Sequence, residues 1–248
     1  MNYRIYTKRH LKKNAFASWL ERLSITNLLI IINIITFIFF IILLAFNIPI
    51  NYIAIQPDVF MSGRAVWTLI TSMFMHAPGM MPLLSFHLII NMFVLFQLGN
   101  LSEKIIGRKR FLWFYLISGI FASLLFVFLA YFFGNSYVGS RIFGSPDIPA
   151  LGASGAIFAI AGLLMILIPK LRFMIIFFPF FSLPAFVMIP LVLFVVWIAS
   201  SSIAIAAGTQ AVMGNVAHFG GFLAGVFYGL YLRYKYPRKT KALSRYFT

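Results

Sequence analysis

The chain has 248 residues, of which 62% are hydrophobic and 10% charged, and its formal net charge is +16. Several apolar runs reach the roughly 20 residues that a helix needs to cross a bilayer. The polar segments between these runs are too short to form a core of their own, so a large soluble domain is excluded. There is no cysteine, which excludes disulfides, thiol nucleophiles and cysteine-bound metals.

Residues 1–26 are basic and precede an apolar run without a small-residue cleavage motif, so we expect a retained first span rather than a signal peptide. Within them, Leu11 to Leu23 is typical of an amphipathic helix on the membrane surface. Apolar runs predict six spans, at 27–46, 84–100, 110–133, 154–168, 185–205 and 215–233. The predicted fold is an all-α membrane protein, in which one six-helix membrane domain (27–233) lies between a basic N-terminal segment (1–26) and a basic tail (234–248).

The cations support this arrangement of spans. Eighteen of the 20 Lys and Arg residues lie in the N-terminal segment, the second-to-third and fourth-to-fifth connections, and the tail. Only Arg64 and Arg141 fall on the other side, so the positive-inside rule predicts that both termini are cytoplasmic. A nucleic-acid partner is not expected, because it would need these cations gathered on one folded surface.

Two connections depart from simple hairpins. Residues 47–83 form a long connection with Trp67 and His76, which we expect to fold on the outer surface. Residues 173–184 are apolar but contain Pro179 and Pro184, which indicates an interfacial or kinked lead-in to the fifth helix.

The fourth span is short. Residues 154–168 give about 22 Å of helix against roughly 30 Å of hydrocarbon. If Pro169 and Lys170 mark the inner boundary, Ser154 lies below the outer one, and residues 134–153 must descend to meet it. Such backbone is tolerated only when it is shielded or lines a wet cavity, so the sequence predicts a buried aqueous site.

A serine and a histidine in membrane-type sequence indicate chemistry there. Ser154 begins the fourth span and His218 lies in the sixth, which supplies a nucleophile and a base. No aspartate falls in a span and both Glu residues lie in cytoplasmic segments, so we expect a Ser-His dyad without a carboxylate. The combination suggests peptide-bond hydrolysis inside a bilayer.

Small residues explain how the two spans approach each other. They recur every three or four positions on each helix, as Gly155, Ala159 and Gly162, and as Gly221, Gly225 and Gly229 after His218. Small residues let helix backbones come close, although such stripes commonly serve packing alone.

An oxyanion hole needs hydrogen-bond donors. Ser154 at a helix N-terminus leaves backbone N–H groups free, and His87 and Asn91 share one face of the second span and add two side-chain donors. Interhelical hydrogen bonding is the alternative reading of the His87–Asn91 pair.

At these residues the chain resembles the rhomboid family of intramembrane serine proteases. The run Gly152-Ala153-Ser154-Gly155 looks like the family's G-x-S-G motif, and His87-x-x-x-Asn91 resembles its second-helix pair. His218, Gly221 and Gly225 match its H-x-x-G-x-x-x-G pattern. The resemblance covers about residues 27–233 in the family's order.

The resemblance implies a rhomboid-type bundle with a short, recessed fourth helix. It makes Ser154 the nucleophile, His218 the general base and acid, and His87, Asn91 and the Ser154 N–H the oxyanion hole, with no metal or organic cofactor. The implied substrates are membrane-anchored proteins cut in or near transmembrane segments, within a lipid bilayer. Two positions depart from the family pattern: Thr68 follows Trp67 where arginine is common, and Phe158 replaces the tyrosine that stacks on the histidine.

Three further features have milder interpretations. Glu103 resembles the acidic position that ends the family's second helix, where structural pairing is favoured over catalysis. Residues 206–214 are a candidate mobile cap over the serine. The phenylalanine-rich fifth span with Pro190 is either a lateral gate or a lipid-facing helix.

Two other functions stay open at this point. A rhomboid-like protein that binds membrane helices without cutting them usually lacks the serine or the histidine, whereas this chain has both. A transporter would use the broken entrance to the fourth span, but the spans contain no carboxylate and no inverted repeat. The bare six-span core fits a prokaryotic plasma membrane, and the basic N-terminus leaves an organelle membrane as the alternative.

Overall fold

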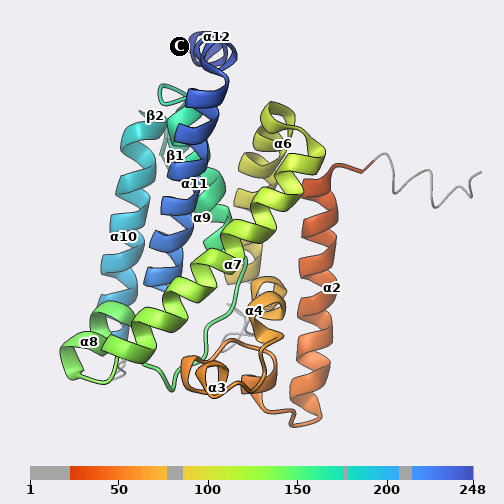
Figure 1. Ribbon diagram of the computed structural model, residues 1–248, viewed down its shortest axis with the longest axis vertical. Coiled ribbons are helices and arrows are strands. Elements are labelled where there is room, and N and C mark those ends of the chain that lie inside the picture. Colours follow the sequence, from red (N-terminus) through yellow and green to blue (C-terminus); the bar gives the residue numbers. More distant parts are fainter. Residues whose placement is uncertain (1–22, 77–85, 176–177, 207–213, 248) are drawn as a thin grey trace, which may run out of the picture.

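A computed structural model describes residues 23–76, 86–175, 178–206 and 214–247, arranged as one helical bundle (Figure 1). The helices of the bundle are α2 (Ile25–Ala45), α5 (Phe86–Val94), α6 (Asn100–Ile106), α7 (Arg108–Phe133), α9 (Ser154–Leu167), α10 (Ala185–Ala206), α11 (Asn215–Lys235) and α12 (Pro237–Tyr246). Short helical turns are η1 (Ile50–Tyr52), α3 (Pro57–Met61), α4 (Thr68–Thr71), η2 (Ser72–Phe74), η4 (Leu95–Gly99) and α8 (Tyr137–Phe143). The strands are β1 (Arg172–Ile175) and β2 (Phe178–Pro184).

Four segments in the described ranges are long and apolar enough to cross a membrane: Ile25–Ala45, Phe86–Ile106, Arg108–Phe133 and Ala185–Ser202. The second of these joins α5 and α6 through the π-helical turn η4. Helix α9 is apolar but has only 14 residues, and α11 has 21 residues that include Arg233 and Lys235. The expected spans therefore correspond to helices, but the count of six transmembrane helices is not confirmed.

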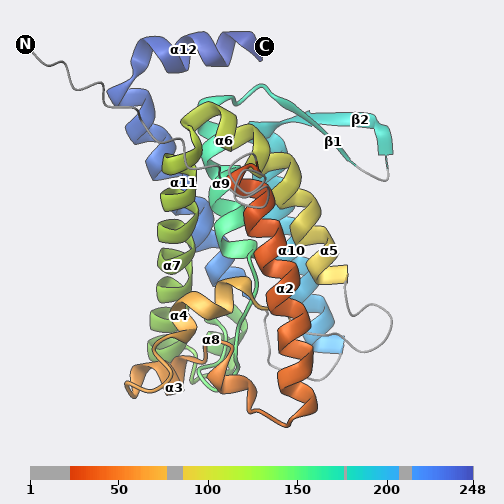
Figure 2. The same cartoon turned by 90° about the vertical axis from the view of Figure 1, so that its right-hand side faces the viewer.

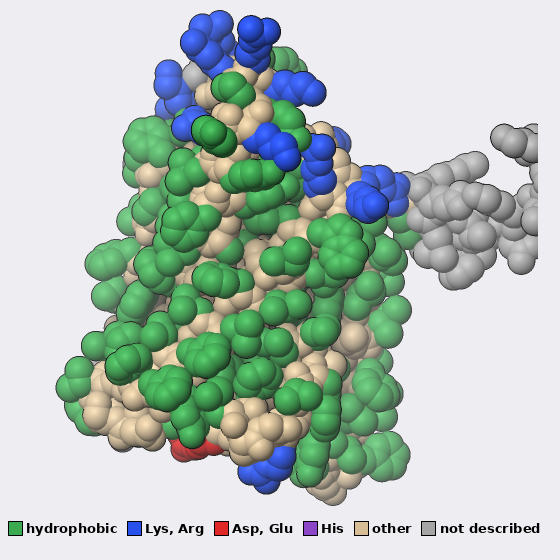
Figure 3. All heavy atoms as spheres, viewed as in Figure 1, with side chains coloured by type: hydrophobic (Ala, Val, Ile, Leu, Met, Phe, Trp, Pro, Cys, Tyr) green, Lys and Arg blue, Asp and Glu red, His purple; other side chains and the backbone are tan. Residues whose placement is uncertain are grey.

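The two ends of the molecule differ in charge. Figure 3 shows Lys and Arg side chains gathered at the end that carries α12, and hydrophobic side chains over most of the face below. We call this end the basic end; α3 and α8 lie at the opposite end (Figures 1 and 2). Most of the basic N-terminal segment (1–22) lies outside the described residues.

The tail forms a helix. Within residues 234–248, α12 begins with a proline at its first turn and lies across the basic end, nearly perpendicular to α11 (Figure 2). Leu243 and Phe247 pack at the edge of the main core.

Residues 173–175 and 178–184 correct the all-α expectation. They form most of an antiparallel hairpin in which Arg172 pairs with Pro184 and Phe173 with Leu183. The Arg172 guanidinium donates to the Ser182 hydroxyl (2.9 Å) and carbonyl oxygen (2.6 Å) across the two strands. Proline interrupts a helix but is tolerated on an edge strand, and both strands of a two-stranded sheet are edges, so these prolines are compatible with the hairpin.

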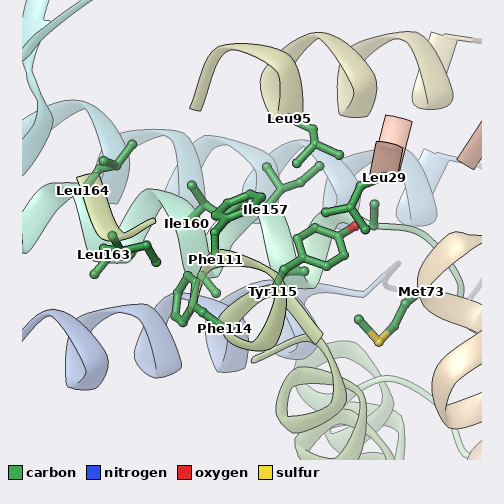
Figure 4. Close-up of a cluster of buried hydrophobic side chains, with 14 of the residues drawn as sticks. Leu29, Met73, Leu95, Phe111, Phe114, Tyr115, Ile157, Ile160, Leu163 and Leu164 are labelled. Atoms are coloured by element: carbon green, nitrogen blue, oxygen red, sulfur yellow. The ribbon is translucent and has the colours of Figure 1, made fainter. Parts of the chain in front are cut away.

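The main core surrounds α9. Ala159, Ile160, Leu163 and Leu164 are fully buried, and side chains such as Leu29, Leu95 and Tyr115 from α2, η4 and α7 pack around them (Figure 4). Helix α9 is thus the central element of the bundle, and residues 144–153 run up to its start from the opposite end (Figure 2). The sequence predicts that residues 134–153 descend to Ser154; in the structure residues 144–153 do so, whereas Tyr137–Phe143 forms α8 at the opposite end.

Candidate active site

Ser154 is the first residue of α9. The first amide bonded within the helix is that of Ile157, which donates to the carbonyl of Ala153 (3.1 Å). The N–H groups of Ser154, Gly155 and Ala156 therefore precede the intrahelical ladder, as at any helix N-terminus. The start of α9 combines a hydroxyl with main-chain donors and the positive end of the helix dipole.

The connection between α2 and α5 holds the segment that leads to Ser154. Ile55 and Ala150 exchange two main-chain hydrogen bonds (2.9 and 2.8 Å), and Gly152 N donates to the carbonyl of Ser72 (2.8 Å). Gly152 has a φ of +124°, a conformation that favours glycine. These bonds satisfy main-chain groups of the irregular segment and fix the position of the serine.

His218 lies in the first turn of α11, after Gly214 in the left-handed conformation (φ +60°). Its Nε2 is 2.7 Å from the hydroxyl oxygen of Ser154. The Phe158 ring, one turn along α9, lies 4.7 Å from the imidazole between ring centroids, with a tilt of 38°. The buried Nδ1 of His218 has no hydrogen-bond partner in the described part of the chain, so no carboxylate orients the ring there.

Glycines bring the two helices together. A methyl group on Gly221 would lie 1.9 Å from the Gly155 carbonyl oxygen, and one on Gly225 would lie 2.0 Å from that of Ala159. A methyl group on Gly162 would meet the Phe222 carbonyl oxygen at 2.4 Å. The close approach predicted from these small residues is confirmed, and it places the Ser154 and His218 backbones at a fixed separation.

His87 and Asn91 occupy different environments on α5. A methyl group added to Gly152 would lie 3.1 Å from His87 Cε1 and 3.8 Å from Ser154 Oγ, so the His87 ring borders the serine. Asn91 is buried, and its Nδ2 is 3.2 Å from Nε2 of His76. His87 is thus available beside Ser154, while the Asn91 amide is engaged by a second histidine.

Comparison with protein-family models identifies the family of this chain. The family model described as "Rhomboid domain" matches residues 63–235, most of the chain. The chain belongs to the rhomboid family. This match begins later than the membrane domain expected from residue 27.

Curated rhomboid relatives match part of the chain. One is the presenilin-associated rhomboid-like protein, mitochondrial, of Homo sapiens, which is 31% identical over 146 residues, 59% of this chain and 34% of the relative. Another is rhomboid protein 1, mitochondrial, of Saccharomyces cerevisiae, which is 29% identical over 168 residues, 65% of this chain and 43% of the relative. The chain therefore aligns with less than half the length of these relatives.

His76 lies beside Asn91 and His87, although the sequence indicated only that it belongs to the outer connection. It is fully buried, contacts Asn91, and has its ring centroid 5.3 Å from that of His87. Burial and the nearby His87 lower the pKa of His76 to about 3, so the ring is neutral at physiological pH. The apolar run Met73-Phe74-Met75 before it was the signal for burial.

Glu103 has the structural role favoured from the sequence. Its carboxylate accepts hydrogen bonds from the N–H groups of Ile25 and Thr26 and from the Thr26 hydroxyl, all at 2.9 Å. Arg108 Nε lies 3.9 Å away. The carboxylate therefore caps the N-terminus of α2 and ties it to α6, far from Ser154 in the fold.

Thr68 follows Trp67 where arginine is common in the rhomboid pattern, and hydrogen bonds of these two residues stabilise the turn instead. Trp67 Nε1 donates to the Tyr52 carbonyl (2.9 Å), and the buried Thr68 hydroxyl donates to that of Ala65 (2.6 Å). These bonds stabilise the turn without an arginine at this position.

In the ranges that the structure covers, no cluster of three or more His, Asp or Glu side chains is arranged to hold a metal ion. The candidate cap, residues 206–214, lies mostly outside the described residues, since 207–213 are not among them.

Proposed function

We propose that this rhomboid chain is an intramembrane serine protease, with Ser154 as nucleophile and His218 as general base and acid. The observation that carries the proposal is the 2.7 Å contact between Ser154 Oγ and His218 Nε2. A hydroxyl needs an adjacent base to become a nucleophile near neutral pH, and imidazole suits this task.

The proposed reaction proceeds through an acyl-enzyme. His218 Nε2 takes the Ser154 proton as the hydroxyl oxygen attacks the scissile carbonyl carbon, and the carbonyl π electrons move to its oxygen. Collapse of this tetrahedral intermediate breaks the C–N bond, and His218 gives its proton to the leaving amine. Water then attacks the ester with His218 again as base, and Ser154 leaves with its proton restored.

The oxyanion is proposed to form between α9 and α5. The Ser154 N–H lies at the positive end of the α9 dipole, and His87 borders Ser154 across Gly152. Asn91 is the third proposed donor, and its contact with His76 holds the amide in place before substrate arrives. No metal or organic cofactor takes part in this scheme.

Transmembrane protein segments are the proposed substrates. The 14 residues of α9 give about 21 Å of helix, shorter than a hydrocarbon core of about 30 Å. Cleavage requires an extended peptide, so residues that weaken a helix in the substrate lower the cost of exposing its backbone at this depth.

We further propose a six-helix bundle in the membrane, with α9 and α11 added to the four candidate spans and both termini on the side of the basic end. The positive-inside rule makes that side the cytoplasm or its organellar equivalent. The relatives are named as mitochondrial proteins and lend no support to the prokaryotic plasma membrane expected from the sequence.

Covalent labelling tests the proposal. The full chain in detergent or liposomes is treated with a fluorophosphonate, and cleavage of a reconstituted single-span substrate is followed in parallel. We expect labelling and cleavage by the wild type and neither by Ser154→Ala or His218→Ala. The matched control is Ser202→Ala, which removes a hydroxyl from the exposed surface of α10 and is expected to leave both signals unchanged.

The same experiment separates the proposal from its rivals. Folded wild-type protein that neither labels nor cleaves contradicts the protease and favours a rhomboid-like protein that only binds membrane helices. Solute uptake into vesicles that persists in Ser154→Ala would support a transporter instead.

A further inference from the structure

An apolar groove of about 510 Å³ runs between α7 and α11 on the outer surface of the bundle. Its walls include the exposed rings of Trp113, Phe121 and Phe227. Ser118 also lines it, but its hydroxyl already donates to the Phe114 carbonyl (2.6 Å) within α7. Tyr228 lines the groove as well, and its ring stacks on that of Phe114 with 4.9 Å between the centroids, so the groove offers mainly aromatic and aliphatic surface.

Two cations stand at the basic end of this groove. Lys109 and Arg110 line it and are exposed, and the Arg110 guanidinium lies 5.7 Å from the centroid of the Tyr236 ring. Neither forms an ion pair within the described chain; the nearby Glu103 carboxylate caps α2 and faces Arg108 instead. The groove thus joins an apolar channel to two uncompensated positive charges.

We propose that this groove binds one anionic phospholipid. Its phosphate contacts Lys109 and Arg110, and one acyl chain lies against Trp113, Phe121 and Phe227. Basic sites between transmembrane helices on the cytoplasmic or matrix side suit anionic headgroups. Arginine and lysine are the side chains that bind phosphate most strongly.

Dimensions and charge together favour a lipid over a protein partner. Lys109 and Phe121 are twelve residues apart on α7, which corresponds to about 18 Å. That distance matches an acyl chain reaching from the headgroups to the middle of a bilayer whose hydrocarbon is about 30 Å thick. Figure 3 shows the same pattern on this face, with hydrophobic side chains below a rim of cations.

A bound lipid would contact α7 and α11 at once. Since α11 carries His218, a ligand on this seam stabilises the packed arrangement relative to any state in which α11 separates from α7. The lipid site itself does not depend on proteolysis, so it can be tested in Ser154→Ala protein.

Native mass spectrometry of the full chain in detergent measures the binding directly. The protein is titrated with dioleoylphosphatidylglycerol or dioleoylphosphatidylcholine, and the first bound lipid is quantified. We expect tighter binding of phosphatidylglycerol by the wild type. Replacing both cations, Lys109→Gln with Arg110→Gln, is expected to weaken phosphatidylglycerol binding about thirty-fold, roughly five-fold per cation, and to weaken phosphatidylcholine binding much less, because the choline cation offsets the charge of its phosphate.

A charge-matched control separates the groove from general attraction. Arg238→Gln with Lys239→Gln removes two exposed cations from α12 that do not line the groove, and should keep the wild-type preference. Equal loss of preference in this control, or none in the groove variant, overturns the proposal.

The apolar part of the site has its own test. Ala224→Phe fills the groove and Phe227→Ala removes one wall, so each should weaken binding of both lipids, while thermal unfolding reports whether the variant is folded. Displacement of phosphatidylglycerol by equimolar glycerol 3-phosphate would overturn the lipid assignment, because it would mean that the headgroup alone is recognised.

Discussion

The α9–α11 pair and the peripheral helix α10 are built in opposite ways. Between α9 and α11, main chains touch where Gly221 faces Gly155 and Gly225 faces Ala159. Helix α10 instead presents large side chains outward, with Phe194 64% and Phe186 54% exposed. This chain thus fixes the spacing between Ser154 and His218 with glycines, and leaves large phenylalanine side chains exposed on α10.

Helix α2 shows a third arrangement. Its C-terminal half has exposed apolar side chains, as at Ile35 and Ile38, and Glu103 holds its first turn through three hydrogen bonds. Hydrogen bonds at one end thus fix the position of α2, whereas backbone packing fixes the position of α11.

The largest effect is expected at Gly221. Gly221→Ala places a methyl group against the Gly155 carbonyl oxygen, so α9 and α11 must separate, at a cost of about 3 kcal/mol in unfolding free energy. Fluorophosphonate labelling should fall with it, because Ser154 and His218 move apart.

The matched control for Gly221→Ala is Ala199→Val, which also enlarges a side chain but on the exposed face of α10. Steric-trap or denaturant unfolding in detergent measures both. Equal destabilisation of the two variants would remove the proposed distinction between the helices.

Loss of the Glu103 carboxylate is the next largest effect. Glu103→Ala leaves the Ile25 and Thr26 donors of α2 without partners and should lower the unfolding free energy by about 2 kcal/mol. Glu103→Gln keeps an acceptor and should lose about half as much. Faster hydrogen exchange confined to the first turn of α2 would identify the cause, and an unchanged exchange rate there would contradict it.

We expect burial of His76 to make the folding stability depend on pH, with a smaller effect than the two above. Its pKa is about 3 in the fold against 6.5 when exposed, so the unfolded chain binds more protons as the pH falls below 6.5. Between pH 7 and 5.5 this site should lower stability by about 1 kcal/mol, and the loss should continue to about pH 3. Denaturant midpoints at both pH values, compared between wild type and His76→Gln, measure it; the same slope in both proteins would argue against a neutral buried His76.

Phe194 gives the smallest effect. Phe194→Ala removes a ring that mostly faces outward, so the unfolding free energy should change by less than about 0.5 kcal/mol. Substrate cleavage should also stay within about two-fold if α10 is a lipid-facing helix. A large rise in cleavage rate with unchanged stability would instead assign α10 the role of a lateral gate.

The sequence predicted the helices well because their signals are local. Apolar runs and glycine spacing located α7, α9 and α11 to within a few residues, and the shortness of α9 required the descending segment before Ser154. Glu103 was recognised as structural, but its partners on α2 could not be read from sequence, since they lie nearly 80 residues away.

Other features depend on contacts between distant segments. The β1–β2 hairpin arises from pairing between two short strands, of which β2 contains prolines. Sequence periodicity does not reveal such pairing in a short apolar stretch. The burial of His76 beside Asn91 depends on how the first connection folds back on α5. Within the second span, the π-helical turn ends at Gly99, where a methyl group would meet Thr26 at 2.8 Å, a fit that only the packed bundle defines.

Contact between the main chains of α9 and α11 also limits which substitutions this interface can accept. A side-chain interface can be repacked by compensating substitutions, but a carbonyl oxygen 1.9 Å from an added methyl group has no rotamer to change. In a saturation mutagenesis screen for folded protein, Gly221 and Gly225 should therefore reject all nineteen alternatives, while the outward faces of α2 and α10 accept most apolar residues.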